Sequence, residues 1–362
     1  MRFEASFVVE TCAHVTTLYK PKEGGALGEG EFCDNTPRCF YDMERYGVDM
    51  CIIKSSDTGG RRPGPTNEIA KLAELVDKYP DKFRACCGSN VDRQTLDSKV
   101  VHGEVKWSLD AALQDMEAAL KTGKFVGIGE FLPRNINPKY VYTFEERLDE
   151  VRMFAELARK YNVTLDWHDF IMHDGWDPYD QLSRLAEEYP DVTIIVCHGS
   201  YAIGSHAQGA VNIRKACAVA EHAENIYLEC GTWPAEYFQF ALKNPNVGAT
   251  QLLWGGDYGN VPQYITAHPG EDPSSYATSM KRWPHVPSYQ TEWWGWSLHQ
   301  IRKIRDWVTQ DEINLILGGN AAKIFKLPVP YPRMFPDGRP DLYGIHWKES
   351  VPFIPDDQIR NL

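Results

Sequence analysis

Hydrophobic residues along the chain fall into short runs, which alternate with longer segments that repeat apolar and polar residues at helical spacing. A short apolar run that ends at a polar residue or a glycine predicts a buried β-strand. Eight such strands are expected at residues 7–10, 50–54, 83–88, 125–130, 164–168, 193–198, 226–229 and 251–255. Amphipathic helices are expected between them at residues 67–78, 109–121, 144–161, 178–188 and 213–223.

The order of these elements predicts an α/β protein. Strands that alternate with helices form parallel βαβ units, and eight such units fit a closed (β/α)₈ TIM barrel better than an open doubly wound sheet. No G-x-G-x-x-G motif follows the first strand, which further disfavours a dinucleotide-binding sheet. Thr143 with Glu146, and Thr309 with Glu312, match the capping box that begins a helix.

Polar side chains stand where three of the expected strands end. His168 closes the run 163–168, His198 closes the run 192–198, and Asp257 follows the run 252–256. The carboxyl ends of barrel strands converge on one face, where active sites are built. Two imidazoles and a carboxylate at that face predict a site for a divalent metal ion.

Composition narrows the class of protein. The hydrophobic content of 43% and the charged content of 24% are ordinary for a globular protein with a large core. The net charge of −12, with no basic cluster, argues against a nucleic-acid partner. No apolar run approaches the length of a membrane span, and the N-terminus has no signal-peptide pattern. These features predict a cytoplasmic enzyme that acts on a small molecule.

The cysteines indicate a reduced protein. Their number is nine, which is odd, and their spacing is irregular. Several stand inside apolar runs, as buried thiols do, so a disulfide framework is not expected.

Three stretches exceed a minimal barrel. Residues 20–38 form a Gly- and Pro-containing excursion, and residues 258–299 form a long segment rich in Trp and Tyr. Long loops on the carboxyl-terminal face are expected here, and the second is a candidate lid or oligomer contact. We expect one barrel domain over residues 1–327 and an extended Pro-rich tail over residues 328–362. That tail favours oligomerisation, as a homo-oligomer or as a heteromer with a paralogous chain.

From the first strand to about Leu327, the chain resembles amidohydrolase family 2. This group of metal-dependent TIM-barrel enzymes includes aminocarboxymuconate-semialdehyde decarboxylase. The elements that carry the resemblance, in order, are Cys12-Ala13-His14, FYDMERYGVD at residues 40–49, YPDKF at residues 79–83, the strand ends at His168 and His198, Gly255-Gly256-Asp257, and ILGGNAAKIF at residues 316–325. The set is specific in this order, whereas each element alone is weak.

The first strand departs from the family pattern, which is His-x-His or Glu-x-His. The matching positions here are Cys12 and His14. The resemblance implies that His14 is a metal ligand. Cys12 is either a thiolate ligand, which would favour zinc, or a small buried residue that has replaced a lost ligand.

The resemblance also implies roles at the other strand ends. Asp257 is the metal-bound or water-activating aspartate, and His168 and His198 are candidate ligands. His198 is also a candidate acid beside the substrate. Glu130 is a candidate carboxylate ligand whose alternative is a simple ion pair. Candidates for contact with the substrate or with the ligands are Glu229, His173 and Trp254.

Three functions follow as expectations. The first is a metal-dependent hydrolase or non-oxidative decarboxylase acting on a small carboxylate-bearing substrate, with zinc preferred and manganese or iron as alternatives. The second is an oxygen-activating hydroxylase with a dinuclear iron or iron–manganese centre, because additional carboxylates stand near the histidines. The third is a non-catalytic metal-binding subunit of a heteromer. The first is favoured because it needs only residues that match the family.

Overall fold

A computed structural model describes most of the barrel. The described residues are 7–25, 29–34, 36–54, 69–88, 108–131, 141–168, 177–200, 206–259 and 293–328. The expected tail beyond residue 328 and the candidate His173 lie outside them.

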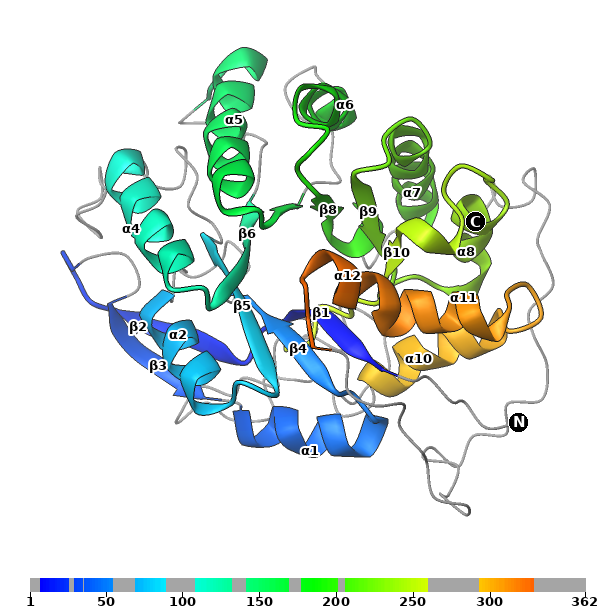
Figure 1. Ribbon diagram of the computed structural model, residues 1–362, viewed down its shortest axis with the longest axis horizontal. Coiled ribbons are helices and arrows are strands. Elements are labelled where there is room, and N and C mark those ends of the chain that lie inside the picture. Colours follow the sequence, from blue (N-terminus) through cyan, green and yellow to red (C-terminus); the bar gives the residue numbers. More distant parts are fainter. Residues whose placement is uncertain are drawn as a thin grey trace.

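Eight strands form one parallel sheet in the order β1-β4-β5-β6-β7-β8-β9-β10. Their bounds are β1 (Val9–Ala13), β4 (Met50–Ile53), β5 (Phe83–Gly88), β6 (Phe125–Phe131), β7 (Thr164–Trp167), β8 (Ile194–Val196), β9 (Ile226–Glu229) and β10 (Leu252–Leu253). These strands surround the centre of the molecule in Figure 1, with helices outside them. The predicted TIM-barrel fold is therefore confirmed.

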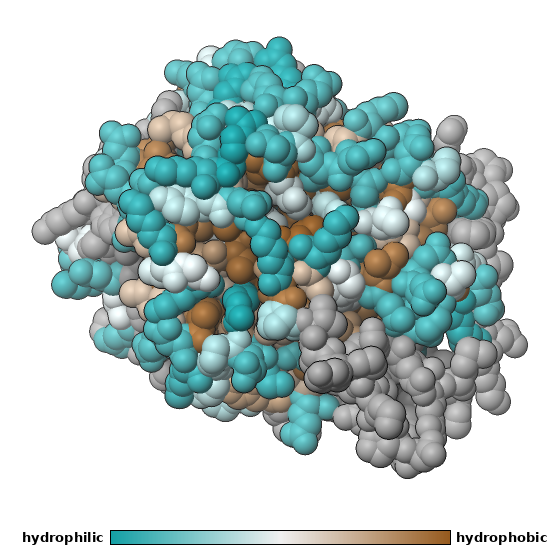
Figure 2. All heavy atoms as spheres, in the orientation of Figure 1, coloured by the Kyte–Doolittle hydropathy of each residue, from teal (hydrophilic) through white to brown (hydrophobic). Residues whose placement is uncertain are grey.

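Most of the helices lie outside the sheet, and the last described one lies across one end of the barrel (Figure 1). They are α1 (Thr36–Tyr46), α2 (Ile69–Lys78), α4 (Leu109–Lys121), α5 (Phe144–Tyr161), α6 (Pro178–Glu188), α7 (His206–Ala220), α8 (Phe238–Leu242), α10 (Trp293–Lys303), α11 (Gln310–Asn314) and α12 (Asn320–Ile324), with short turns η1 (Cys197–Ser200), η2 (Ala235–Tyr237), η3 (Ala249–Gln251) and η6 (Leu315–Gly319). Both predicted capping boxes are present, at the starts of α5 and α11. Figure 2 shows the surface of the molecule from the same side as Figure 1, with hydrophilic residues over much of it and hydrophobic residues between them.

The barrel closes through the segment that follows β10. The Thr11 N–H donates to the Trp254 carbonyl at 3.1 Å, and the Tyr258 N–H donates to the Cys12 carbonyl at 2.9 Å. The His14 N–H donates in turn to the Tyr258 carbonyl at 2.6 Å. Gly255 permits this approach, since a Cβ there would lie 2.4 Å from the Thr11 hydroxyl oxygen. Closure thus brings Asp257 beside the end of β1.

A hydrophobic cluster closes the other end of the barrel. A Cβ on Gly318 would lie 2.2 Å from the Phe7 carbonyl oxygen, so η6 lies against the start of β1. The cluster joins strand residues to the end of the chain's last described helix, and its members include Val9, Ile52, Ile195, Leu253, Ala321, Ala322 and Phe325. This end of the barrel is therefore closed by apolar contacts.

The structure corrects three local expectations. Residues 20–38 are not a loop excursion, because β2 (Thr16–Pro21) and β3 (Gly30–Asp34) form an antiparallel pair and α1 follows at once. The segment after β10 is not irregular as far as residue 299, because α10 begins at Trp293. The helix expected at residues 213–223 begins earlier, at His206.

Among the helices of the described residues, none combines the length and the apolar character needed to cross a membrane. The eight cysteines whose side chains the structure describes are buried and free, as expected of reduced thiols.

Candidate metal centre

Seven of the predicted residues lie at the carboxyl ends of the strands. Cys12 is in β1, Glu130 is in β6 and Glu229 ends β9. The other four follow strands directly or at a short distance, namely His14, His168, His198 and Asp257. All except His168 are buried, and His168 is half-buried.

One set of donors consists of Cys12, His14 and Asp257, whose ligand atoms all lie within 4.8 Å of one another. His14 Nε2 is 3.6 Å from Cys12 Sγ and 3.2 Å from Asp257 Oδ1. Ligands bound at about 2.1 Å to one tetrahedral ion stand about 3.4 Å apart. The spacing of these three donors therefore suits a single metal ion.

Glu130 links this set to a second one. Its Oε2 is 3.6 Å from His14 Nε2, and its Oε1 accepts a hydrogen bond from the Cys12 thiol at 3.2 Å. The same Oε1 lies 3.6 Å from His198 Nε2. Cys12, Glu130, His198 and Glu229 also have ligand atoms within 4.8 Å of one another. Glu130 therefore stands between the two donor sets.

His168 lies at the edge of these sets. Its ring is nearly perpendicular to that of His198, with centroids 5.0 Å apart. Among the described residues it belongs to neither donor set.

Burial acts to raise the pKa of Glu130, but Lys54 and then the histidines 168, 198 and 14 outweigh burial and hold that pKa well below its usual range. Glu130 is therefore ionised.

Two residues of the site have left-handed backbone conformations. His198 has φ 56° and Asp257 has φ 55°, and residues other than glycine seldom adopt this backbone region. Such conformations persist where the surrounding structure holds them, and they are common at functional sites. His198 Nδ1 is buried and, among the described residues, has no hydrogen-bond partner. A buried nitrogen of this kind and the mixed sulfur, nitrogen and oxygen donor set fit a divalent metal ion.

Protons compete with a metal at these donors. Burial raises the pKa of the Cys12 thiol well above its ordinary value, and the negative charge of Glu130 raises it further. Burial acts to lower the pKa of His14, but the hydrogen bond to Asp257 and the charge of Glu130 outweigh burial and raise it to about 9. Metal binding at Cys12 and His14 would therefore release protons.

Glu10 does not face the donors but fixes the backbone that carries them. Its Oε1 accepts hydrogen bonds from the N–H groups of Cys12 at 2.8 Å and Gly256 at 2.7 Å. Its Oε2 accepts one from Trp294 Nε1 at 2.6 Å. Burial raises the pKa of Glu10 to about 8, although these hydrogen bonds act to lower it. One carboxyl group thus ties β1 to the Asp257 segment and to α10.

Two charged residues that were not among the predicted site residues lie beside the donors. Lys54, directly after β4, is fully buried, and its Nζ is 2.8 Å from Asp166 Oδ2 and 3.3 Å from Glu229 Oε1. The signal was present in the sequence, because Lys54 ends one apolar run and Asp166 interrupts another. A charged residue within a buried strand needs a partner of opposite charge.

Trp254 lies in the core rather than among the donors. Its Nε1 donates to Ser297 Oγ at 2.8 Å, and its ring centroid is 6.0 Å from that of Trp294. It joins β10 to α10.

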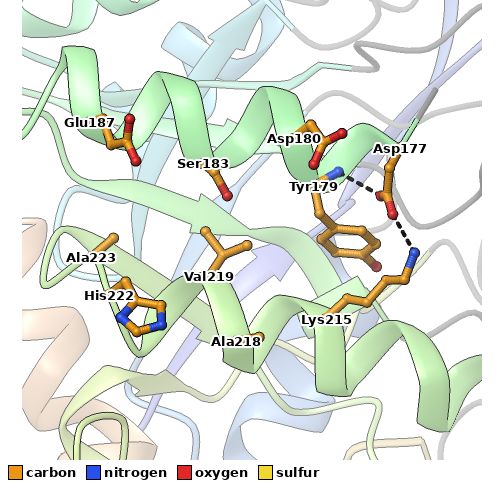
Figure 3. Close-up of a pocket in the computed structure, with 10 residues that line it drawn as sticks. All are labelled: Asp177, Tyr179, Asp180, Ser183, Glu187, Lys215, Ala218, Val219, His222 and Ala223. Atoms are coloured by element: carbon orange, nitrogen blue, oxygen red, sulfur yellow. Dashed lines mark hydrogen bonds and ion pairs between the residues drawn. The ribbon is translucent and has the colours of Figure 1, made fainter.

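A surface pocket of about 380 Å³ lies elsewhere, between α6 and α7. Figure 3 shows Asp180 and Glu187 of α6 across from Val219 and His222, with Lys215 paired to Asp177. None of the donors lines it, so it is separate from the candidate metal centre.

A family model described as Amidohydrolase matches residues 43–327. The chain belongs to the amidohydrolase family. The match includes Glu130, His168, His198 and Asp257 and begins after Cys12 and His14. Metal-dependent hydrolases and decarboxylases are typical of the amidohydrolase family.

Solved structures support the fold of this amidohydrolase. YJJV, a TatD homolog from Escherichia coli K12, is 16% identical with a TM-score of 0.52, covering 90% of this chain and 99% of that one. The phosphotriesterase homology protein of Escherichia coli is 15% identical with a TM-score of 0.52, covering 89% and 100%. A mutant organophosphorus hydrolase from Deinococcus radiodurans is 13% identical with a TM-score of 0.51, covering 90% and 95%. Among curated proteins, none matches this chain.

The role of Glu10 predicts a graded loss of stability. Glu10→Ala leaves three buried donors without their acceptor, so we expect the free energy of unfolding to fall by about 2–5 kcal/mol. Glu10→Gln keeps one oxygen for both backbone N–H groups and loses only the acceptor of Trp294, so its loss should be smaller. Urea denaturation measures both.

A double-mutant cycle provides the control. Trp294→Phe should lower the free energy of unfolding less in the Glu10→Gln background than in the wild type, because the hydrogen bond between Trp294 Nε1 and residue 10 is already lost. Equal losses for Glu10→Ala and Glu10→Gln, or purely additive effects with Trp294→Phe, would contradict this role.

Proposed function

We propose that this amidohydrolase is a single-metal hydrolase or non-oxidative decarboxylase acting on a small carboxylate-bearing substrate. The observation that carries the proposal is the set Cys12, His14 and Asp257, whose donor atoms lie within 4.8 Å of one another at the carboxyl end of the barrel. This is the face where barrel enzymes carry their active sites. The substrate class comes from the family.

Cys12, His14 and Asp257 would hold the ion, with Glu130 and His198 as further ligands. A thiolate and an imidazole favour zinc over harder cations, while the carboxylates also accept manganese or iron. When bound, the ion would supply Lewis acidity to a water molecule or to a substrate carboxylate.

The protein's own groups handle the protons. Asp257 Oδ1 is held 3.2 Å from His14 Nε2, which orients the carboxylate. Asp257 Oδ2 is the atom that accepts a proton from water or returns one to the substrate. His198 Nε2 lies 4.0 Å from that oxygen, so if His198 does not bind the ion it could exchange the proton with Asp257 through one water molecule. Glu130 lies 3.6 Å from Nε2 of both His14 and His198, so it would orient the two rings toward the centre.

A second candidate function has its own observation. Glu130 and Glu229 add two carboxylates to Cys12 and His198 in the second donor set, which is the kind of donor set a dinuclear oxygen-activating centre would use. Lys54 Nζ lies 3.3 Å from Glu229 Oε1, and this ammonium opposes a second cation there. The single-metal function is therefore favoured.

Metal content and product analysis test the proposal. We expect about one zinc or manganese ion per chain by inductively coupled plasma mass spectrometry, and turnover of a panel of carboxylated aromatics that stops on chelation and returns with metal. Release of carbon dioxide identifies a decarboxylase, whereas incorporation of ¹⁸O from labelled water identifies a hydrolase. Two ions including iron, or full activity after chelation, would contradict the single-metal function.

Asp257→Asn tests proton transfer. The amide retains an oxygen but accepts a proton poorly, so kcat at saturating metal should fall about 10²–10⁴-fold while metal content is retained. Asp180→Asn, on the exposed side of α6, serves as the matched control and should leave kcat unchanged. Undiminished turnover by Asp257→Asn would remove Asp257 from this role.

Cys12→Ser tests the thiolate. With cobalt in place of the native ion, a thiolate ligand gives a charge-transfer band in the near ultraviolet, and we expect this band in the wild type but not in Cys12→Ser. Cys217→Ser, a buried cysteine on α7, is the control and should keep the band. A band that survives Cys12→Ser would show that Cys12 is not a ligand.

A further inference from the structure

Lys54 carries a fully buried ammonium group into an acidic cluster. Its Nζ lies 2.8 Å from Asp166 Oδ2, 3.3 Å from Glu229 Oε1 and 3.8 Å from Glu130 Oε1. All three carboxylates are buried. An ionised carboxylate in the interior is strongly destabilising unless a positive charge accompanies it. Lys54 is the described cation that contacts all three.

Glu130 joins this cluster to the candidate metal ligands. The oxygen that lies 3.8 Å from the Lys54 ammonium is also 3.2 Å from Cys12 Sγ and 3.6 Å from His198 Nε2. One carboxylate oxygen therefore faces the proposed metal ligands and the ammonium together. In two-metal hydrolytic sites the ions stand about 3.5–4 Å apart, which is the range in which one carboxylate can contact both.

We infer that the Lys54 ammonium takes the place that a second divalent cation would occupy between Glu130, Asp166 and Glu229, and thereby limits the centre to one metal ion per chain. This inference rests on the proposed metal site. It concerns the number of ions and not the reaction they support.

Other contacts fix the carboxylates around the ammonium. Glu229 Oε1 also accepts a hydrogen bond from the Thr11 hydroxyl at 2.9 Å, and Oε2 accepts the His198 N–H at 3.1 Å. Asp166 Oδ1 accepts the Thr164 hydroxyl at 2.9 Å. These hydrogen bonds hold the carboxylates in place whether the cation between them is the ammonium or a metal ion.

The ammonium lies 2.8–3.8 Å from oxygens of all three carboxylates, so a divalent cation among the same oxygens would stand at short range from a like charge.

Counting metal ions in Lys54 variants tests the inference. Wild type, Lys54→Met and Lys124→Met are each equilibrated with excess zinc or manganese, freed of loosely bound metal and analysed by inductively coupled plasma mass spectrometry. Lys124→Met removes an ion-paired lysine near the surface and is the matched control. We expect about one ion per chain for the wild type and the control, and about two for Lys54→Met. Thermal melting should show that added metal stabilises Lys54→Met more than the wild type.

Loss of Lys54 leaves buried carboxylates without a cation, so Lys54→Met is expected to fold best when metal is present. Lys54→Met with Asp166→Asn removes one charge of each sign and keeps Glu130 and Glu229, so it should fold without metal and still take a second ion at higher metal concentration. A folded Lys54 variant that holds only one ion at saturating metal overturns the inference. If Lys54→Met does not fold even in excess metal, the double variant decides, and one ion per chain in the double variant overturns the inference.

The wild-type count separates the two proposals. Two ions in the wild type overturn the role of Lys54 but leave a metal-dependent function intact. No ion in the wild type, under conditions where the chain is folded, overturns the proposed function together with this inference.

Discussion

The carboxyl end of this barrel depends on the neutralisation of buried carboxylates. Glu130, Asp166, Glu229 and Asp257 are all buried within a small region, and each would cost several kcal/mol as an isolated ion. Lys54 contacts three of them, and His14 contacts Glu130 and Asp257. Because the charges share these cations, removing any one group changes the protonation or occupancy of the others. The site therefore behaves as a coupled unit rather than as a list of ligands.

Barrel closure supplies the geometry of that unit. The segment after β10 pairs with β1 through the carbonyls of Trp254, Cys12 and Tyr258, so it sets Asp257 beside His14. Glu10 links the same two segments a second time, because its carboxyl group accepts hydrogen bonds from the N–H groups of Cys12 and Gly256. The left-handed conformation of Asp257 is held by these contacts on both sides. The same interactions that complete the fold thus position the proton-handling carboxylate.

Much of this arrangement could be predicted from the sequence, because the carboxyl ends of all the strands of a parallel barrel lie close together on one face. His168, His198 and Asp257 were recognised since each follows an apolar run, and eight runs were enough to predict the fold. Lys54 and Asp166 were missed because strand patterns do not tell which side of the barrel wall a charged residue faces. The hairpin at residues 16–34 was missed because glycines and prolines in that stretch suggested a loop.

The ionisation of Cys12 is linked to the charge of Lys54. A thiolate at this position adds one negative charge to a region already crowded with carboxylates. Cys12 contacts Glu130 directly, and that carboxylate disfavours the thiolate. The Lys54 ammonium acts in the opposite direction on Cys12, since it favours the ionised sulfur. Burial and Glu130 outweigh the ammonium and keep the pKa of the Cys12 thiol well above its ordinary value, so the ionised sulfur that a metal ion would bind is favoured only by the cations beside it.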